Sequence, residues 1–349
     1  MRKQHIQVPE TVRMKPGALS RLGLYLARPG FRRAALFVSE GLHAPILETA
    51  ERGLAERGIA IAQRVEVREA SVEGAVALLG GLARGTQAIV GLGGGKALDV
   101  AKYVASLSGL AYYAVPTSLS NDGFCSPQSS LTLQGKRKSL PTGLPYAVVV
   151  DTEVCLNAPV KLWHSGVGDL AAKLTAVFDW KLAFHACGKP VNDLAALLSD
   201  ATVYQFMARP ARDADGVRLL ATALMLNGVA MEIAGSSRPA SGSEHLISHA
   251  LDTGGGRPAL HGLQTGTAAY LVSAVQKNQQ DRIGALFAAT GFWESVRAAP
   301  FSKREWKAAV AAAPGIKDDF HTVLSVRDCW PEMEAAMEGD AALAGCFDD

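Results

Sequence analysis

The sequence predicts an α/β domain built on a parallel sheet, followed by an all-helical domain. The chain has 349 residues, more than one hydrophobic core usually organises, so two domains are expected. From residue 34 to about 150, short apolar runs alternate with helical patterns, which is typical of parallel strands joined by crossover helices. After about residue 155 the strand signal fades and helical periodicity dominates. We therefore expect domains over residues 1–155 and 156–349.

The elements of the first domain follow from its apolar runs. AALFVS, IAQRVEV, AIVGLG and YYAVP predict strands, and helices are expected up to about residue 56, over 71–84 and in LDVAKYVASLS. Residues 133–151 predict a hairpin followed by a strand. Lys136, Arg137 and Lys138 on this hairpin are expected to form a solvated edge that prevents further strand pairing.

The second domain is predicted from helical periodicity alone. The patterns cover residues 165–187, 191–207, 212–235, 243–252, 263–276, 280–291 and 303–312. Asp169 falls in the first turn of the first of these helices, and by itself it is interpreted as a residue that complements the helix dipole. The last stretch of the chain predicts an ordered helix with an acidic end, to which we assign no chemistry.

Composition and charge exclude several classes of function. The net charge is only +2 and the basic residues are scattered, so nucleic-acid binding is not expected. No apolar run approaches the roughly 20 residues that span a bilayer, and MRKQHIQVPE lacks the apolar core of a secretory signal. We expect a cytoplasmic protein without a membrane partner. The five cysteines show no CxxC spacing, so they are expected to be reduced and mostly buried.

Two loops at predicted strand ends are candidate binding sites. Gly93, Gly94 and Gly95 lie between a strand and a helix, where backbone N–H groups can approach a phosphate. GLGGGK is neither a GxGxxG fingerprint nor a Walker loop, so a tight turn without a ligand is the alternative. The polar loop 117–126 also follows a strand, although its composition equally makes turns and caps.

Three of the eight histidines lie in one short window, SGSEHLISHALD and HGLQTG. His245 and His249 are four residues apart, so on a helix they share a face. His261 follows the loop GGGRP at 254–258, which can fold back toward them. With a carboxylate these residues could bind a metal, but paired histidines are also common as ordinary surface or core residues. Spacing alone leaves both interpretations open.

Five motifs together carry a family resemblance. GGGKALDVAKY, PTSLSNDGFCSP, SGVGDLAAKLTAVFDW, SSRPASGSEHLISHALD and HGLQTG resemble, in order, those of the sn-glycerol-1-phosphate dehydrogenases. This family belongs to the superfamily of iron-type alcohol dehydrogenases, glycerol dehydrogenase and dehydroquinate synthase. The resemblance runs from about residue 30 to 325. It implies a dehydroquinate synthase-like fold, with a Rossmann-like domain, an all-helical domain and a cleft between them, and it implies a homo-oligomer.

The resemblance implies that Asp169, His245 and His261 bind a divalent metal and that His249 lies against the substrate. One carboxylate and two imidazoles suit Zn²⁺, Ni²⁺ or Fe²⁺, with Zn²⁺ the first choice, and three protein ligands leave room for a substrate oxygen. Iron-type enzymes carry a further histidine where this chain has Lys173. Dehydroquinate synthases carry a glutamate where it has Asp169, which weighs against a lyase.

The resemblance also implies an NAD or NADP cofactor. The residues expected to bracket its pyrophosphate are Gly93, Gly94, Gly95, Lys96 and Ala97, with Asp99 near the turn. The residues expected along the nicotinamide are Thr117, Ser118, Leu119, Ser120 and Ser126, and Asp122 would face the substrate. Ser39 stands where glycerol dehydrogenases tend to carry an aspartate for the adenosine ribose. Without that carboxylate a 2′-phosphate meets less repulsion, so NADP remains an alternative to NAD.

The function expected from the resemblance is the reversible, metal-dependent reduction of dihydroxyacetone phosphate to sn-glycerol 1-phosphate by NAD(P)H. The metal would act as a Lewis acid and His249 would transfer the proton, unless His249 only orients a metal ligand. Lys173, Arg238 and the 136–138 cluster are candidates for holding the substrate phosphate, though each also suits an ordinary ion pair. The alternatives are a dehydrogenase of another polyol or aldehyde and, less favoured, a dehydroquinate or inosose synthase-type lyase.

Overall fold

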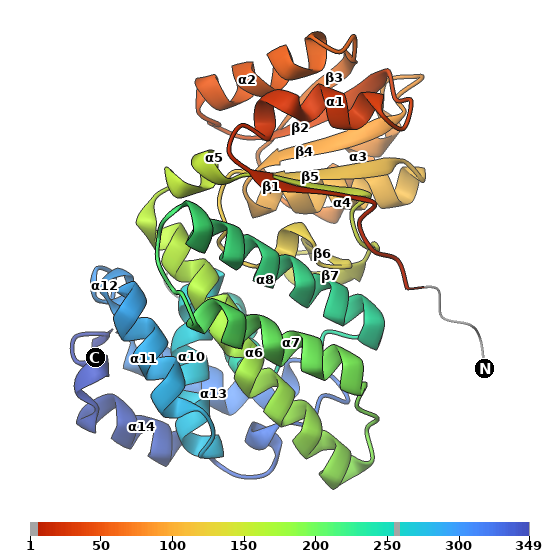
Figure 1. Cartoon of the computed structure of the whole chain (residues 1–349). Coiled ribbons are helices and arrows are strands. Elements are labelled where there is room, and N and C mark those ends of the chain that lie inside the picture. Colours follow the sequence, from red (N-terminus) through yellow and green to blue (C-terminus); the bar gives the residue numbers. More distant parts are fainter. Residues whose placement is uncertain (1–5, 255–258, 349) are drawn as a thin grey trace. The chain divides into compact units, whose positions relative to one another are not determined.

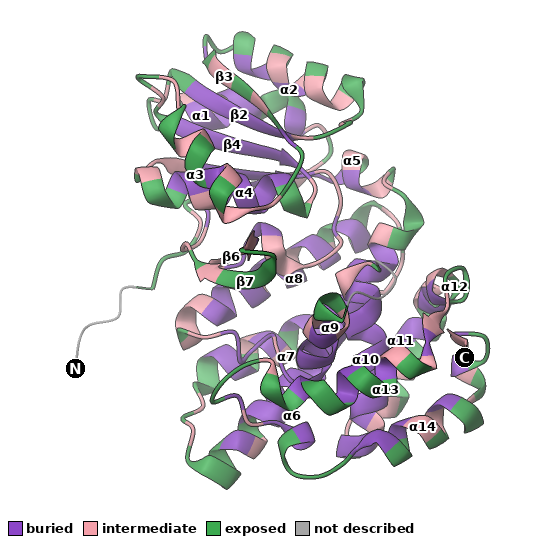
Figure 2. Cartoon of the chain, turned by 180° about the vertical axis from the view of Figure 1, so that it is seen from behind, coloured by how far each residue is buried: buried purple, intermediate pink, exposed green. Residues whose placement is uncertain are grey.

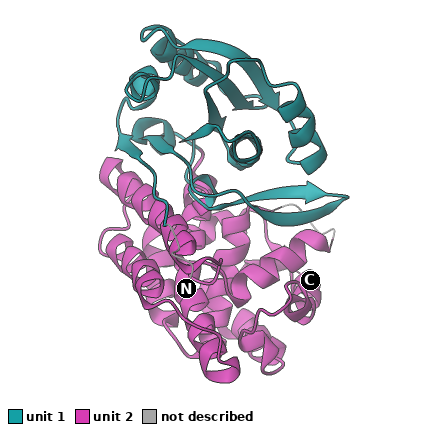
Figure 3. Cartoon of the chain, turned by 90° about the vertical axis from the view of Figure 1, so that its right-hand side faces the viewer, with its two compact units in different colours: residues 1–119, 123–158 teal, residues 120–122, 159–349 magenta. Residues whose placement is uncertain are grey.

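The computed structural model describes residues 6–254 and 259–348, and the chain forms two compact units (Figures 1 and 3). The first unit comprises Met1–Leu119 and Gly123–Ala158, and the second comprises Ser120–Asp122 and Pro159–Asp349. The short segment Ser120–Asp122 is thus part of the second unit. Apart from Gly254, the GGGRP loop predicted at 254–258 lies outside the described residues.

A six-stranded, fully parallel sheet forms the centre of the first unit, in the order β1-β8-β5-β4-β2-β3. The strands are β1 (Thr11–Lys15), β2 (Arg33–Ser39), β3 (Ala60–Val67), β4 (Ala88–Gly93), β5 (Ala111–Pro116) and β8 (Ala147–Asp151). The four central strands are almost entirely buried, which explains why they are continuous apolar runs in the sequence. The predicted parallel sheet is confirmed.

Helices cover both faces of this sheet (Figure 1). Side chains of α1 (Leu22–Ala27) and α2 (Ala44–Ala55) pack on one face, and those of α3 (Val72–Gly80) and α4 (Gly95–Ser108) pack on the other. Because the helix after β2 and the helix after β4 cover opposite faces, the winding of the chain reverses between these two neighbouring strands. Ligands of open α/β sheets bind at the carboxyl ends of the strands at such a reversal.

The remaining elements of the first unit are a hairpin and a short helix. β6 (Gln128–Leu133) and β7 (Lys136–Pro141) form an antiparallel pair, and α5 (Thr152–Leu156) follows β8. Lys136, Arg137 and Lys138 are all exposed on β7, which confirms the solvated edge. The helix predicted over 71–84 ends at Gly80, because two glycines in succession favour leaving the helix.

The second unit is mostly helical. Its helices are α6 (Val160–Cys187), α7 (Asp193–Met207), α8 (Ala214–Ala234), α9 (Ser243–Thr253), α10 (His261–Gln276), α11 (Gln280–Thr290), α12 (Phe292–Arg297), α13 (Lys303–Ala312) and α14 (Trp330–Gly339). The expectation of an all-helical domain needs one correction, since β9 (Phe301–Ser302) pairs in parallel with β10 (Phe347–Asp348). The short α12 was not predicted.

α8 bears on the expectation that no segment crosses a membrane. It has 21 residues and a mean hydropathy of 1.5 over an 18-residue window, so by length and composition it could cross a membrane. Of that window, 61% is buried within the protein. A core helix satisfies the same test, and α8 is therefore only weak evidence for a membrane span.

Candidate metal centre and active site

The site in the second unit is organised by a backbone contact between α6 and α10, two largely buried helices (Figure 2). A Cβ atom on Gly262 would lie 1.8 Å from the carbonyl oxygen of Ser165, and one on Gly168 would lie 2.1 Å from that of Gly262. Any larger residue would push the helices apart. Asp169 follows Gly168 and His261 precedes Gly262, so the glycine contact brings the carboxylate and the imidazole together.

Asp169, His245 and His261 form a compact set of potential metal ligands. Each offers one atom, and these atoms all lie within 4.8 Å of one another. Asp169 Oδ1 lies 3.5 Å from His245 Nε2 and 3.9 Å from His261 Nε2. This oxygen is buried and has no hydrogen-bond partner among the described residues. A buried carboxylate oxygen without a donor, facing two imidazole nitrogens, fits a divalent cation.

The second oxygen of Asp169 is held by the protein. Oδ2 accepts the backbone N–H of Asp122 at 3.0 Å and lies 3.2 Å from Lys173 Nζ, which is itself 2.8 Å from Asp122 Oδ2. Burial raises the pKa of Asp169, but Lys173 and the two histidines outweigh it and hold this pKa well below its ordinary value. Burial and the charge of Asp169 raise the pKa of Asp122. Lys173 thus keeps the carboxylate of this candidate ligand ionised.

Lys173 itself is fully buried, and its amine also approaches the carbonyl oxygen of Ala240 at 3.4 Å. Its three N–H groups therefore have three acceptors within the protein. The expectation that Lys173 could hold a substrate phosphate is corrected accordingly. Its position one turn after Asp169 places the ammonium group against that carboxylate.

His249 lies beside the ligand set and is not part of it. Its ring centroid is 6.5 Å from that of His245 and 5.9 Å from that of His261. It is half-buried, whereas His245 is buried. α9 therefore carries His245 within the cluster and His249 one turn further along, as the four-residue spacing predicts.

The segment Ser120–Asp122 is fastened to the same helices. The hydroxyl of Ser165 donates to the carbonyl oxygen of Ser120 at 2.8 Å and accepts the N–H of Gly262 at 3.2 Å. Together with the bond from Asp122 to Asp169, this places Asp122 next to the proposed ligands. Sequence reasoning missed Ser165, because its contacts with Ser120 and Gly262 join residues that are far apart in the sequence.

The glycine turn of the first unit lies at the carboxyl ends of β4 and β2. The hydroxyl of Ser39 accepts the N–H of Gly94 at 2.9 Å, and a Cβ atom on Gly93, whose φ is +139°, would lie 2.2 Å from Ser39 Oγ. Gly95 and Lys96 are exposed at the start of α4, while Ala97 is buried in the core. The exposed start of a helix of 14 residues suits a phosphate.

The loop after β5 begins beside this turn, because the N–H of Thr117 donates to the carbonyl oxygen of Gly93 at 3.1 Å. Ser118 is half-buried and Leu119 is buried. Ser126 is also buried, and its hydroxyl accepts the N–H of Gln128 at 3.2 Å.

Asp99 lies one turn into α4, where it pairs with the buried Lys102 at 3.5 Å. Lys102 in turn donates to the carbonyl oxygens of Gly123 and Ser126, at 2.8 and 3.0 Å. Burial raises the pKa of Asp99, which Lys102 opposes. The pair therefore anchors the loop in which the nicotinamide contacts were expected. Sequence reasoning missed Lys102, although a lysine three residues after an aspartate on an apolar helix is a recognisable signal.

Arg238 has a structural role instead of the expected phosphate contact. Its guanidinium donates to the carbonyl oxygens of His321 and Asp319 and stacks 3.6 Å from the centroid of the Phe320 ring. These contacts fix the loop before Val323. The 136–138 cluster lies on the exposed strand β7, as described above.

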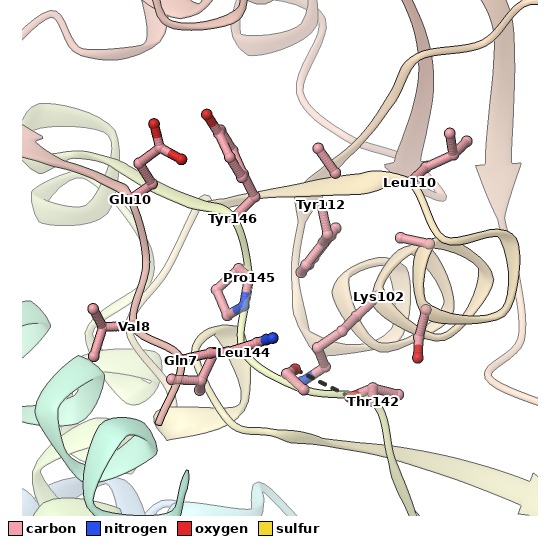
Figure 4. A pocket seen from close by; sticks show the side chains of 14 residues that line it. Gln7, Val8, Glu10, Lys102, Leu110, Tyr112, Thr142, Leu144, Pro145 and Tyr146 are labelled. Atoms are coloured by element: carbon pink, nitrogen blue, oxygen red, sulfur yellow. Dashed lines mark hydrogen bonds between the residues drawn. The ribbon is translucent and has the colours of Figure 1, made fainter. Parts of the chain in front are cut away.

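A cavity of about 340 Å³ in the first unit is shown in Figure 4. It is lined by residues that include Lys102, Tyr112, Thr142 and Tyr146. The start of β5 and the segment before β8 contribute to its wall, so it lies at the amino ends of the strands. The glycine turn and Thr117 lie at the carboxyl ends, and this cavity is therefore separate from the expected cofactor site.

Comparison with known proteins identifies the family. Residues 13–159 match the family model of the iron-containing alcohol dehydrogenases. The chain is 39% identical over 267 residues to the glycerol-1-phosphate dehydrogenase [NAD(P)+] of Hyperthermus butylicus, covering 74% of this chain and 75% of that protein. It is 32% identical over 339 residues to the enzyme of the same name from Aeropyrum pernix, covering 95% and 96%. The chain belongs to the glycerol-1-phosphate dehydrogenase family.

This membership confirms the resemblance carried by the five motifs. The fold of this glycerol-1-phosphate dehydrogenase family member is also similar to a solved structure, the glycerol dehydrogenase of Schizosaccharomyces pombe. The TM-score is 0.76 at 18% identity, covering 99% of this chain and 92% of that one. At this identity the similarity concerns the fold, and it confirms the predicted architecture of a parallel-sheet unit and a mostly helical unit.

Proposed function

We propose that the protein catalyses the reversible, NAD(P)H-linked reduction of dihydroxyacetone phosphate to sn-glycerol 1-phosphate with one divalent metal. The observation that carries this proposal is the cluster of Asp169, His245 and His261, in which a buried carboxylate oxygen faces two imidazoles and has no hydrogen-bond partner among the described residues. The names of the relatives from Hyperthermus butylicus and Aeropyrum pernix support the substrate and cofactor.

Each reacting group has a proposed role. When bound, the metal supplies Lewis-acid stabilisation of the charge that develops on the carbonyl oxygen, and NAD(P)H supplies the hydride. Asp169, His245 and His261 hold the cation, and Lys173 keeps Asp169 ionised by direct contact. The reduced ketone also needs a proton, which His249 is suited to deliver from beside the ligand set. Asp122, held by Lys173, would orient a substrate hydroxyl.

Zn²⁺ is the favoured metal, because a set of two imidazoles and one carboxylate with room for a substrate is common in catalytic zinc sites. Ni²⁺ and Fe²⁺ accept the same donors and are the alternatives. The metal should be identified by loading the stripped protein with each ion in turn.

The proposed pyrophosphate site is the turn of Gly93, Gly94, Gly95, Lys96 and Ala97 at the start of α4. The proposed nicotinamide contacts are Thr117, Ser118, Leu119, Ser120 and Ser126, the last of which is fixed by Lys102. Ser39 carries no charge that would repel a 2′-phosphate, so both NADH and NADPH are proposed as cofactors. We further propose a cytoplasmic homo-oligomer with a phosphorylated triose as its substrate.

The test is NADH and NADPH oxidation followed at 340 nm, with dihydroxyacetone phosphate, dihydroxyacetone and glyceraldehyde 3-phosphate as substrates. Metal-stripped protein is compared with protein reloaded with Zn²⁺ or Ni²⁺. The proposal predicts metal-dependent turnover of dihydroxyacetone phosphate alone. Equal turnover of dihydroxyacetone would favour a dehydrogenase of unphosphorylated polyols, and cofactor binding without net oxidation of any substrate would favour the lyase.

A further inference from the structure

Glu244, immediately before His245, is a completely buried carboxylate in the first turn of α9. It accepts the N–H of Gly242 at 2.6 Å and the hydroxyl of Thr175 at 2.8 Å, and its Oε1 lies 2.9 Å from His245 Nδ1. An ionised carboxylate can only accept, so Nδ1 of His245 carries the proton in this contact. In the neutral ring the lone pair then lies on Nε2, the nitrogen 3.5 Å from Asp169 Oδ1.

The imidazole of His261 is also fixed as the Nδ1–H tautomer, in this case by hydrogen bonds with neutral groups. The hydroxyl of Ser248 donates to Gln264 Oε1 at 2.7 Å, and its oxygen lies 3.0 Å from His261 Nδ1. A hydroxyl has a single proton, so once this proton is given to Gln264 the oxygen must accept from Nδ1–H of His261. The lone pair of His261 then lies on Nε2, which also faces Asp169.

We propose that Glu244 and the Ser248–Gln264 pair are positioning residues that fix both imidazoles as Nδ1–H tautomers and thereby set the affinity for the divalent cation. Glu244 should have the larger effect on metal affinity, because a hydrogen bond to a charged acceptor is stronger than one between neutral groups. This stronger bond to Nδ1 makes Nε2 of His245 more basic and therefore a better metal ligand. The inference rests on the proposed metal-binding function and adds to it the residues that tune the site.

The turn before α9 holds Glu244 in place. A Cβ atom on Gly242 would lie 2.8 Å from the backbone Cα of Ala176 and 2.9 Å from both Asp179 Oδ2 and Glu244 Oε2, so only glycine fits at this position. Asp179 Oδ2 also accepts the N–H of Ser243 at 2.7 Å. Asp179 and Glu244 both hold the turn before α9 through its backbone N–H groups. Glu244, fixed in this way, orients the imidazole of His245.

The charges around the ligands match a divalent ion. Asp122, Asp169 and Glu244 provide three carboxylates in contact with the ligand set, and Lys173 provides one ammonium group. Carboxylates therefore outnumber ammonium groups around the candidate ligands, an arrangement that favours a cation. Removing the charge of Glu244 should therefore weaken cation binding in two ways. It makes Nε2 of His245 a weaker ligand, and it removes one negative charge from the surroundings of the cation.

The experiment measures the Zn²⁺ dissociation constant of the stripped full-length protein by competition with a chromophoric chelator. E244Q keeps the volume and can keep the hydrogen bonds, but it removes the charge, and S248A removes the neutral contact to His261. We expect E244Q to bind Zn²⁺ roughly 10- to 100-fold more weakly and S248A to show a smaller loss. E305Q, which removes the same charge from the first turn of α13, is the matched control and should bind as the wild type does.

Long-range ¹H–¹⁵N spectra of the histidines provide a readout that a purely structural role would not change. The wild type should show both ligand histidines as Nδ1–H tautomers, and S248A should convert His261 to a mixture. Wild-type Zn²⁺ affinity in both E244Q and S248A would overturn the inference, and S248A tests it even if E244Q does not fold. Absence of Zn²⁺ binding by the wild-type protein would instead refute the proposed metal function.

Discussion

Replacing Gly262 by alanine should damage both the fold and the metal centre. The new Cβ atom would lie 1.8 Å from the carbonyl oxygen of Ser165, whereas ordinary van der Waals contact begins at about 3.4 Å. α6 and α10 must then separate locally by roughly 1.6 Å, the difference between these distances. Overpacking of this kind costs about 1–3 kcal/mol of unfolding free energy. Metal–ligand distances tolerate only about 0.2 Å, so Zn²⁺ affinity should also fall by about tenfold or more.

The assay pairs urea unfolding with Zn²⁺ competition binding. The control is G339A, which introduces the same methyl group at the end of α14, where a Cβ atom would meet no atom of the described residues outside its own helix within 4 Å. That substitution should leave Zn²⁺ binding unchanged and be neutral or stabilising by up to about 1 kcal/mol. The reasoning is refuted if G262A matches G339A in both stability and Zn²⁺ affinity, because α6 and α10 would then not depend on the glycine contact.

Two further predictions concern buried charges outside the ligand set. K102M leaves Asp99 without its partner and two loop carbonyls without a donor, so it should destabilise the protein by roughly 3–5 kcal/mol and weaken NADH binding, measured by fluorescence titration. The exposed K136M is its control, and equal NADH affinity in the two variants would contradict the anchoring role. Burial and then the charge of Glu244 raise the pKa of Asp179 from 3.8 to about 6, so the folded protein holds this proton more tightly than the unfolded chain. The resulting stabilisation is present below about pH 4 and is lost as the pH rises through 6, so wild type should lose up to about 3 kcal/mol relative to D179N by pH 7. Urea unfolding at several pH values checks this, and parallel profiles for the two proteins would exclude it.

The sheet could be predicted from the sequence because its central strands are buried on both faces. β2, β4 and β5 are therefore continuous apolar runs between turn residues. β1 could not be found in this way, since TVRMK is half-buried throughout and its strand conformation depends on pairing with β8. The two-residue strands β9 and β10 depend in the same way on a partner far along the chain.

The candidate site was predictable only in part. Periodicity places His245 and His249 on one helix, but it cannot bring Asp169, far away in the sequence, to the same point. That proximity depends on Gly168 and Gly262, which allow two helices to touch at the backbone. Glu244 escaped the sequence reasoning because neighbouring residues on a helix do not normally face each other. Its contact with His245 is possible at the start of α9, where the carboxylate also accepts the N–H of Gly242.

The central claim is that Asp169, His245 and His261 hold one divalent cation. The most direct measurement is the stoichiometry of Zn²⁺ bound by the wild type and by D169N after equilibrium dialysis, with NADPH binding measured on the same samples. The account predicts one Zn²⁺ per wild-type chain and none in D169N, with NADPH bound equally by both. Stoichiometric Zn²⁺ in D169N, or none in the wild type, would contradict it.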